Sequence, residues 1–170
     1  MKKRTKGFTL IELLVVIAII AILSTVVMTG LNNARAKGRD GKRLTDLKSL
    51  QKALDLYYDT CGGYPALGAS GTYADIAAGA GNLNIDTFDG TCDSTQAFGT
   101  FMNPLPVNPQ PNGSDYQYCS TDDSAAVGAA SCDAATATSY QITFSIENSA
   151  GSLTTAGDYV LTPSGIQGPV

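Results

Sequence analysis

A single acidic residue interrupts the most apolar part of this chain. Glu12 follows the segment Gly7-Phe8-Thr9-Leu10-Ile11, and residues 8 to 31 are otherwise apolar apart from four hydroxyl residues and Gly30. An isolated carboxylate in hydrocarbon costs several kcal/mol, although a position near the end of a membrane span can partly reach water. The chemistry open to such a group is to form half of an ion pair, so we expect Glu12 to have a specific use.

Conventional catalytic and cofactor motifs are missing. The chain contains no histidine, which excludes Ser-His-Asp and Cys-His catalysis and histidine-based metal sites. It also has no GxSxG, GxGxxG, Walker or CxxC motif. The sequence therefore predicts neither an enzyme nor a cofactor. The adjacent acids Asp122 and Asp123 could help to bind calcium, but they lack EF-hand spacing, so we predict no metal site.

Four cysteines all lie beyond the apolar run, at Cys61, Cys92, Cys119 and Cys132. An even number of cysteines in a small exported region indicates two disulfides, with three possible connectivities. We favour Cys61 with Cys92 and Cys119 with Cys132, because each pair closes a loop rich in glycine and aspartate that has little core of its own. Four buried free thiols are the alternative.

The charges are distributed unevenly. All 11 lysines and arginines lie at or before Lys52, whereas residues 53 to 170 carry 12 acids and no base. Such a region repels the phosphate backbone that a nucleic-acid-binding protein must neutralise. We therefore predict no direct nucleic-acid binding by the C-terminal part.

The apolar run predicts a membrane-spanning helix. Its 24 residues make about 36 Å of α-helix, enough to cross a hydrocarbon core of about 30 Å. The basic leader, residues 1 to 7, directly precedes the run, and a second basic stretch, residues 35 to 43, follows it, so charge alone leaves the orientation open. Because disulfides require an oxidising compartment, we expect the N-terminus in the cytoplasm and the cysteines outside.

The helical pattern continues beyond the span, over residues 32 to 60. Apolar residues recur there at spacings of three and four and predict one buried stripe: Leu44, Leu47, Leu50, Leu54, Tyr57 and Tyr58. The helix should end at Cys61-Gly62-Gly63-Tyr64-Pro65, where glycine ends a helix and proline forbids its continuation. Residues 61 to 112 read as a long loop, with a short helix expected near residues 73 to 78.

Three strands are predicted last, over residues 115 to 119, 139 to 147 and 158 to 162. In the middle strand Tyr140, Ile142, Phe144 and Ile146 alternate with polar residues, which is the period of a sheet with one buried face. The segment Asn148-Ser149-Ala150-Gly151-Ser152-Leu153 predicts a hairpin turn. The expected fold is α+β: a long N-terminal α-helix packed on a small antiparallel sheet formed by residues 113 to 170, together with a C-terminal disulfide loop.

The segment from Gly7 to Glu12, with its basic leader and apolar helix, resembles the class III signal of bacterial type IV prepilins and type II secretion pseudopilins. The similarity is convincing over residues 1 to 60. Beyond them it is limited to scattered segments, such as Met102-Asn103-Pro104-Leu105-Pro106-Val107-Asn108-Pro109. Many members of this family also have a proline about where Thr29 stands, and this chain departs from that pattern.

The resemblance implies a set of roles and partners. A prepilin peptidase would cut between Gly7 and Phe8, and Phe8 would become the N-methylated first residue. Glu12 of one subunit would pair with the new Phe8 amine of another, and inner-membrane assembly machinery would build a helical homo-oligomer. The subunit would wait in the inner membrane as a single-pass prepilin before joining a filament at the cell surface.

Three functions remain open at this level. The chain can be the structural subunit of a type IV pilus-like filament, for adhesion, motility or DNA uptake. The alternative is a pseudopilin of a type II secretion system. A third reading is a membrane-anchored binding module or enzyme whose N-terminus resembles a prepilin by coincidence.

Overall fold

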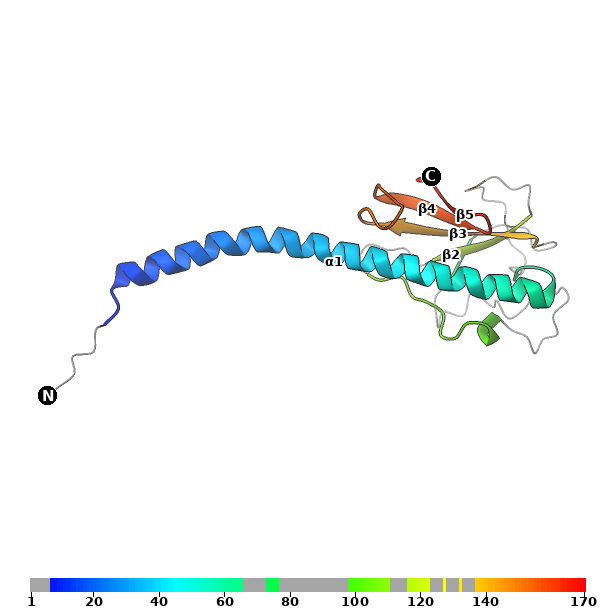
Figure 1. Ribbon diagram of the computed structural model, residues 1–170, viewed down its shortest axis with the longest axis horizontal. Coiled ribbons are helices and arrows are strands. Elements are labelled where there is room, and N and C mark those ends of the chain that lie inside the picture. Colours follow the sequence, from blue (N-terminus) through cyan, green and yellow to red (C-terminus); the bar gives the residue numbers. More distant parts are fainter. Residues whose placement is uncertain are drawn as a thin grey trace. The chain divides into compact units, whose positions relative to one another are not determined.

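The computed structural model describes residues 7–65, 73–76, 98–110, 116–122, 127, 132 and 137–170. It contains one long helix, a 3-10 helix and a five-stranded sheet (Figure 1). The chain divides into two compact units, residues 1–36 and residues 37–170, which are described separately. We call residues 37–170 the head.

Helix α1 runs from Leu10 to Cys61, and its apolar N-terminal part belongs to the first unit. The large apolar side chains between residues 8 and 31 are 44% to 86% exposed. Among the described residues, α1 is the helix that is long and apolar enough to cross a membrane. It continues through Gly30 without interruption.

The end of α1 agrees with the sequence prediction. The helix stops at Cys61, and Gly62 adopts a positive φ of 74° that L side chains rarely adopt. The Gly62 N–H donates to the Tyr58 carbonyl at 2.7 Å, which satisfies one of the last helical carbonyls. Glycine is therefore the residue best suited to this position at the helix end.

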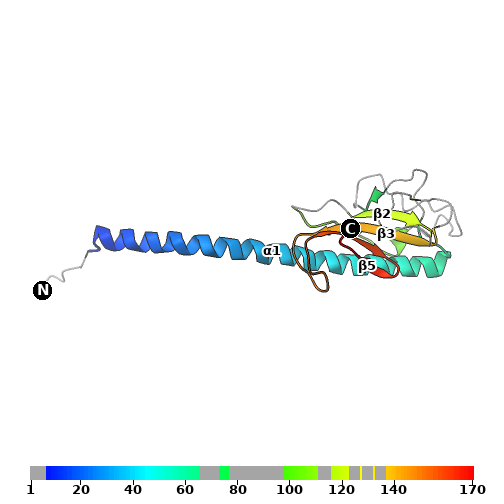
Figure 2. The same cartoon turned by 90° about the horizontal axis from the view of Figure 1, so that it is seen from above.

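The head contains an antiparallel sheet in the order β1-β2-β3-β4-β5, and its longer strands lie beside the C-terminal part of α1 (Figures 1 and 2). The strands are β1 (Ala74–Asp75), β2 (Gln117–Thr121), β3 (Ser139–Ile146), β4 (Gly157–Thr162) and β5 (Gly165–Gln167). The three predicted strands are confirmed as β2, β3 and β4. In the predicted turn between β3 and β4, Ala150 pairs with Leu153.

The prediction of a short helix near residues 73 to 78 is wrong for the described residues 73–76. Ala74 pairs with Tyr118 and Asp75 pairs with Gln117, so this segment forms the edge strand β1. The open edge of β2 offers backbone hydrogen bonds to an extended segment, and this tertiary pairing outweighs the weak local preference for helix. Residues 77 and 78 lie outside the described part of the chain.

The core forms between one face of the sheet and one face of α1, as predicted. The four alternating β3 residues are each at most 4% exposed. They belong to one cluster with the buried helix residues Leu47, Leu50, Leu54 and Tyr57. Tyr58 is an exception to the predicted stripe, because it is 40% exposed and instead contacts the Tyr64 ring, with centroids 4.8 Å apart.

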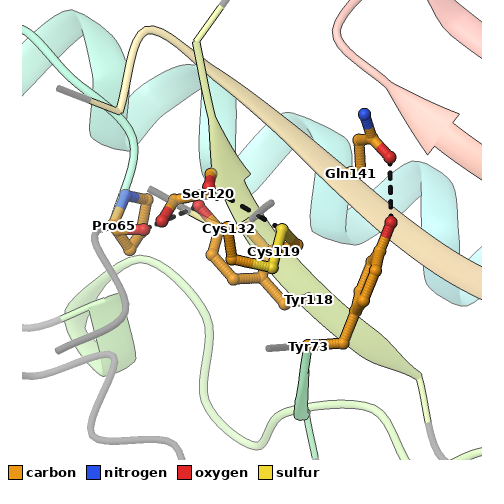
Figure 3. Close-up of a disulfide and its surroundings, with 7 residues drawn as sticks. All are labelled: Pro65, Tyr73, Tyr118, Cys119, Ser120, Cys132 and Gln141. Atoms are coloured by element: carbon orange, nitrogen blue, oxygen red, sulfur yellow. Dashed lines mark hydrogen bonds between the residues drawn. A yellow bond between two sulfur atoms is a disulfide. The ribbon is translucent and has the colours of Figure 1, made fainter. Parts of the chain in front are cut away.

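The alternation in β3 has one exception. Gln141 alternates with the core residues of this strand, but it is only 2% exposed. The Tyr73 hydroxyl donates to Gln141 Oε1 at 2.9 Å, so the segment that contains β1 supplies a partner for the buried amide (Figure 3). A polar side chain can be buried when such a hydrogen bond replaces water.

A disulfide joins Cys119, on β2, to Cys132 (Figure 3). This is one of the two predicted pairs, and it closes a loop with a sequence separation of 13 residues. Cys61 is also disulfide-bonded. Its predicted partner, Cys92, lies outside the described residues, so that pairing stays a prediction.

Candidate assembly site

The start of α1 is built by a reciprocal pair of side chains. The helix begins at Leu10, which makes Thr9 the N-cap residue and Glu12 the third helical residue. Glu12 Oε2 accepts hydrogen bonds from the Thr9 N–H at 2.9 Å and from the Thr9 hydroxyl at 2.7 Å. The Glu12 N–H in turn donates to Thr9 Oγ1 at 3.3 Å. This arrangement is a capping box.

The capping box explains how one chain on its own accommodates Glu12. The carboxylate accepts two hydrogen bonds from Thr9 and lies at the positive end of the helix dipole. Our sequence reasoning missed Thr9, although the spacing Thr9-x-x-Glu12 is a recognised signal for a helix start. The predicted ion pair with Phe8 of a neighbouring copy involves a second chain and stays a prediction.

The surroundings of Glu12 are apolar. A shallow hollow beside it is lined by Phe8, Ile11, Val15 and Val16. Phe8 is 86% exposed, and Ile11 is 69% exposed. A carboxylate at the edge of such a surface can pair with a cation while apolar side chains of the same partner fill the hollow.

The predicted cleavage site lies outside any helix or strand. Gly7 and Phe8 precede α1 and are exposed. Among the described residues, no atom other than those of Gly7 and its chain neighbours lies within 4 Å of the position that a Gly7 Cβ would occupy. The peptide bond between them is therefore accessible in this conformation, as a processing site requires.

A cluster of buried charges in the head was not predicted. Asp40 and Arg43 are completely buried, and Arg43 Nη1 lies 2.6 Å from Asp40 Oδ1 and 2.9 Å from Glu147 Oε1. Arg39 Nε donates to the same Glu147 oxygen at 2.7 Å, and a second ion pair joins these two residues. We call Arg39, Asp40, Arg43 and Glu147 the charge cluster.

The charge cluster connects three parts of the head. Arg43 donates to Asn108 Oδ1 at 2.7 Å and to the Pro109 carbonyl at 2.8 Å, in the loop before β2. Asp40 accepts from the backbone N–H groups of Glu147 at 3.0 Å and Asn148 at 2.8 Å, in the turn after β3. The cluster therefore ties α1 to a loop and a turn that are distant in sequence.

The charge cluster determines which bases of the stretch at residues 35 to 43 can contact lipid headgroups or the acidic faces of neighbouring subunits. Arg43 cannot do so, because it is buried, and Arg39 is engaged by Glu147. The exposed bases of the stretch that remain available for such contacts are Arg35, Lys37 and Lys42.

Acid is expected to weaken the head through Glu147. The hydrogen bond from Arg39, assisted by Arg43, lowers the pKa of Glu147 from its ordinary value of 4.5 to about 2. A lowered pKa stabilises the fold above the unfolded value, and this stabilisation disappears as the pH falls through the folded value. We expect a roughly constant free energy of unfolding above pH 5 and a loss of about 3 kcal/mol between pH 4.5 and 2.

The measurement for this prediction is denaturant unfolding in detergent, followed by near-UV circular dichroism of tyrosine. All eight tyrosines lie in the head, so the signal reports the head alone. Glu147→Gln should remove most of the extra loss of stability below pH 4.5. An unchanged acid profile in this variant would contradict the assignment to Glu147.

No group of three or more acidic or cysteine side chains that could hold a metal ion occurs among the described residues. Asp122 is half-buried after β2. Asp123, its neighbour in the possible calcium site, lies outside the described part of the chain.

Comparison of the sequence with known proteins shows which family the chain belongs to. Residues 2–28 match the family model described as the prokaryotic N-terminal methylation motif. Over 118 residues the chain is 31% identical to type II secretion system core protein G of Klebsiella pneumoniae, an alignment that covers 69% of this chain and 76% of that protein. The chain belongs to the family of type IV pilins and type II secretion pseudopilins.

The chain also matches other members of both branches of this family, the fimbrial proteins and the type II secretion core proteins. A fimbrial protein of Dichelobacter nodosus is 34% identical over 110 residues, which cover 64% of this chain and 68% of that protein. Core protein G of Aeromonas hydrophila is 41% identical over 56 residues, but these cover only 33% of this chain and 39% of that protein. No solved structure matches the chain.

The matched methylation motif includes the candidate assembly site described above. Gly7, Phe8, Thr9 and Glu12 all lie within residues 2–28. The pilin-like fold of a long helix and a small antiparallel sheet is likewise present. Because relatives from both branches match the chain, the comparison does not separate pilins from pseudopilins.

Proposed function

We propose that this protein is the structural subunit of a type IV pilus-like filament. A prepilin peptidase would cleave it between Gly7 and Phe8 and methylate Phe8, and the subunits would then polymerise through their N-terminal helices. The observation that carries the proposal is the exposed apolar surface of residues 8 to 31, which has one carboxylate at its start and lies within a matched methylation motif. Such a filament would serve adhesion, motility or DNA uptake.

The apolar surface would serve in two environments. It first anchors the prepilin in the inner membrane, with its N-terminus in the cytoplasm. When inner-membrane assembly machinery extracts the subunit, the same side chains pack against neighbouring helices and remain shielded from water. Contacts that do not close into a ring propagate as a helical filament.

Glu12 would change partners during assembly. In the single chain, its carboxylate accepts hydrogen bonds from Thr9. Cleavage after Gly7 creates an ammonium group at Phe8, and the Glu12 of a neighbouring subunit can pair with it. Because an unpaired charge in an apolar environment is costly, this pairing favours assembly and fixes the axial register of the subunits.

A type II secretion pseudopilin is the second candidate. The alignment with the Klebsiella pneumoniae protein, which is named as a type II secretion component, favours it. The Dichelobacter nodosus fimbrial relative and the Cys119–Cys132 disulfide, suited to a head exposed outside the cell, favour the pilus. A retraction ATPase encoded nearby would support a pilus, whereas an outer-membrane secretin with other secretion components would support a pseudopilus.

The proposal predicts a specific processing event. When the chain is produced together with a prepilin peptidase, mass spectrometry should show loss of residues 1–7 and addition of one methyl group at Phe8. Gly7→Val should abolish cleavage, because a branched side chain obstructs a site where the sequence has only hydrogen. Gly30→Ala, which lies inside α1, should be processed normally.

An intact Met1 in the membrane fraction, with active peptidase present, would overturn both filament candidates. A membrane-anchored binding module or enzyme would then become the preferred interpretation.

A further inference from the structure

The sheet of the head carries a polar hollow on its outer face. The hollow has a volume of about 290 Å³. It lies at the ends of β2, β4 and β5 and at the start of β3. Residues from all four of these strands and the β4–β5 turn line it, and they include six with hydroxyl or amide side chains: Thr121, Ser139, Gln141, Thr162, Ser164 and Gln167.

The strand register places this hollow on the face opposite α1. Ile142 pairs with Leu161, and both belong to the core against the helix. Side chains alternate between the faces of a strand, so Gln141 and Thr162 point to the other face. Thr121 pairs with Ser139 on that same outer face. The hollow is therefore separate from the helix through which the subunit is proposed to assemble.

The lining is held in place by bonds within the head. The Thr162 hydroxyl lies 2.8 Å from the Ser164 hydroxyl and donates to the Gly165 carbonyl at 3.0 Å. Gln167 Nε2 donates to Ser164 Oγ at 3.4 Å. Tyr73, which directly precedes β1, orients the Gln141 amide by donating its hydroxyl hydrogen to Gln141 Oε1 (Figure 3).

Three of the polar lining residues are buried, whereas Ser139 is half-buried and Ser164 and Gln167 are exposed. Thr121 is 1% exposed, Gln141 is 2% exposed and Thr162 is 7% exposed. Their polar atoms are held on a rigid sheet, and such preorganisation lowers the entropic cost of binding a ligand.

The chemistry of the lining selects a ligand class. Hydroxyl and amide groups both donate and accept hydrogen bonds, as the hydroxyl groups of a saccharide do. Asp122 adds one carboxylate acceptor, and Val127 and Pro163 add apolar surface that can contact the C–H groups of a sugar ring. We propose that this hollow binds one unit of an uncharged saccharide.

The charge of the head excludes the other main classes of carbohydrate ligand. The described residues of the lining include no lysine or arginine, and the sequence has no base after Lys52. A sulfated, phosphorylated or carboxylated sugar would meet the Asp122 carboxylate and an acidic surface without a cation to pair with it. The volume lies at the lower end of the range for ligand pockets, which suits a single sugar residue.

The proposal can be tested without filament assembly, so its outcome is independent of the proposed function. The full chain is placed in a detergent that has no sugar headgroup. Saturation-transfer NMR is then recorded with glucose, galactose, mannose and N-acetylglucosamine, and with glucuronic acid as the anionic probe. We expect at least one neutral sugar to bind with a dissociation constant on the order of 1 mM, and glucuronic acid to bind at least about tenfold more weakly.

Two variants locate the binding to the hollow. Gln167→Ala should weaken binding about fivefold, the usual effect of losing one hydrogen bond. Ser164→Phe should fill the hollow and abolish binding. Gln117→Ala is the matched control, because Gln117 lies on β2 outside the lining and should bind like the unchanged chain. Near-UV circular dichroism verifies that each variant is folded.

Several results would overturn the proposal. The site is refuted if no neutral sugar of the panel binds at about 20 mM, or if Ser164→Phe is folded and binds normally. The ligand class is refuted if glucuronic acid binds as strongly as the best neutral sugar.

Discussion

Replacing Glu12 with glutamine is expected to leave leader removal intact while lowering the yield of assembled filament about 100-fold or more. Glutamine keeps the size of the side chain and can still accept hydrogen bonds from Thr9. It cannot form an ion pair with the Phe8 amine of a neighbour. Removing one partner of a buried ion pair costs about 3–5 kcal/mol, because the other charge remains unpaired. Sheared filaments are quantified by immunoblot, and cleavage is followed by mass spectrometry.

Thr9→Val is the matched control for this prediction. It removes the hydroxyl of the capping box but keeps the carboxylate of Glu12. Loss of an N-cap costs about 1 kcal/mol of helix stability, so filament yield should fall much less than in Glu12→Gln. If Glu12→Gln forms filaments normally, the intersubunit ion pair is refuted and the role of Glu12 reduces to helix capping.

Periodic patterns explain why the main elements could be predicted from the sequence. The stripe from Leu44 to Tyr57 repeats with helical spacing, and the β3 residues from Tyr140 to Ile146 alternate with the period of a strand. Each pattern depends only on neighbouring residues and on which side of the element faces the core. Both elements were therefore predicted close to their observed bounds, Leu10–Cys61 and Ser139–Ile146.

Features that depend on distant contacts were missed. Gln141 is buried because Tyr73, 68 positions away, reaches its amide. β1 exists because residues 74 and 75 meet the edge of β2. Local sequence preference does not report such long-range contacts, because neither partner has an unusual pattern in its own segment.

Two of the features that were not predicted, the charge cluster and the capping box, had recognisable signals in the sequence. Asp40 and Arg43 continue the three- and four-residue spacing of the buried stripe towards the N-terminus, so their burial was foreseeable. Their partner Glu147, at the end of the predicted strand, was not. Thr9 and Glu12 have capping-box spacing, which fixes the start of α1.

Arg43→Met is expected to be strongly destabilising, lowering the free energy of unfolding of the head by about 3–5 kcal/mol. Methionine replaces the apolar stem of arginine but leaves Asp40 without its closest cation and Glu147 with Arg39 alone. It also removes the hydrogen bonds to Asn108 and Pro109. Denaturant unfolding in detergent, followed by the near-UV tyrosine signal, measures the effect.

A matched pair of variants separates the buried cluster from a general effect of charge. Lys42→Met removes an exposed base one position away and should change the unfolding free energy by less than about 0.5 kcal/mol. The double variant Arg43→Met with Glu147→Gln should be less destabilised than the sum of the two single variants, because neutralising Glu147 removes one of the charges left unpaired. Strict additivity of the two changes would mean that Arg43 and Glu147 act independently. The cluster would then be a set of separate contacts and not one unit that fixes the loop and turn on α1.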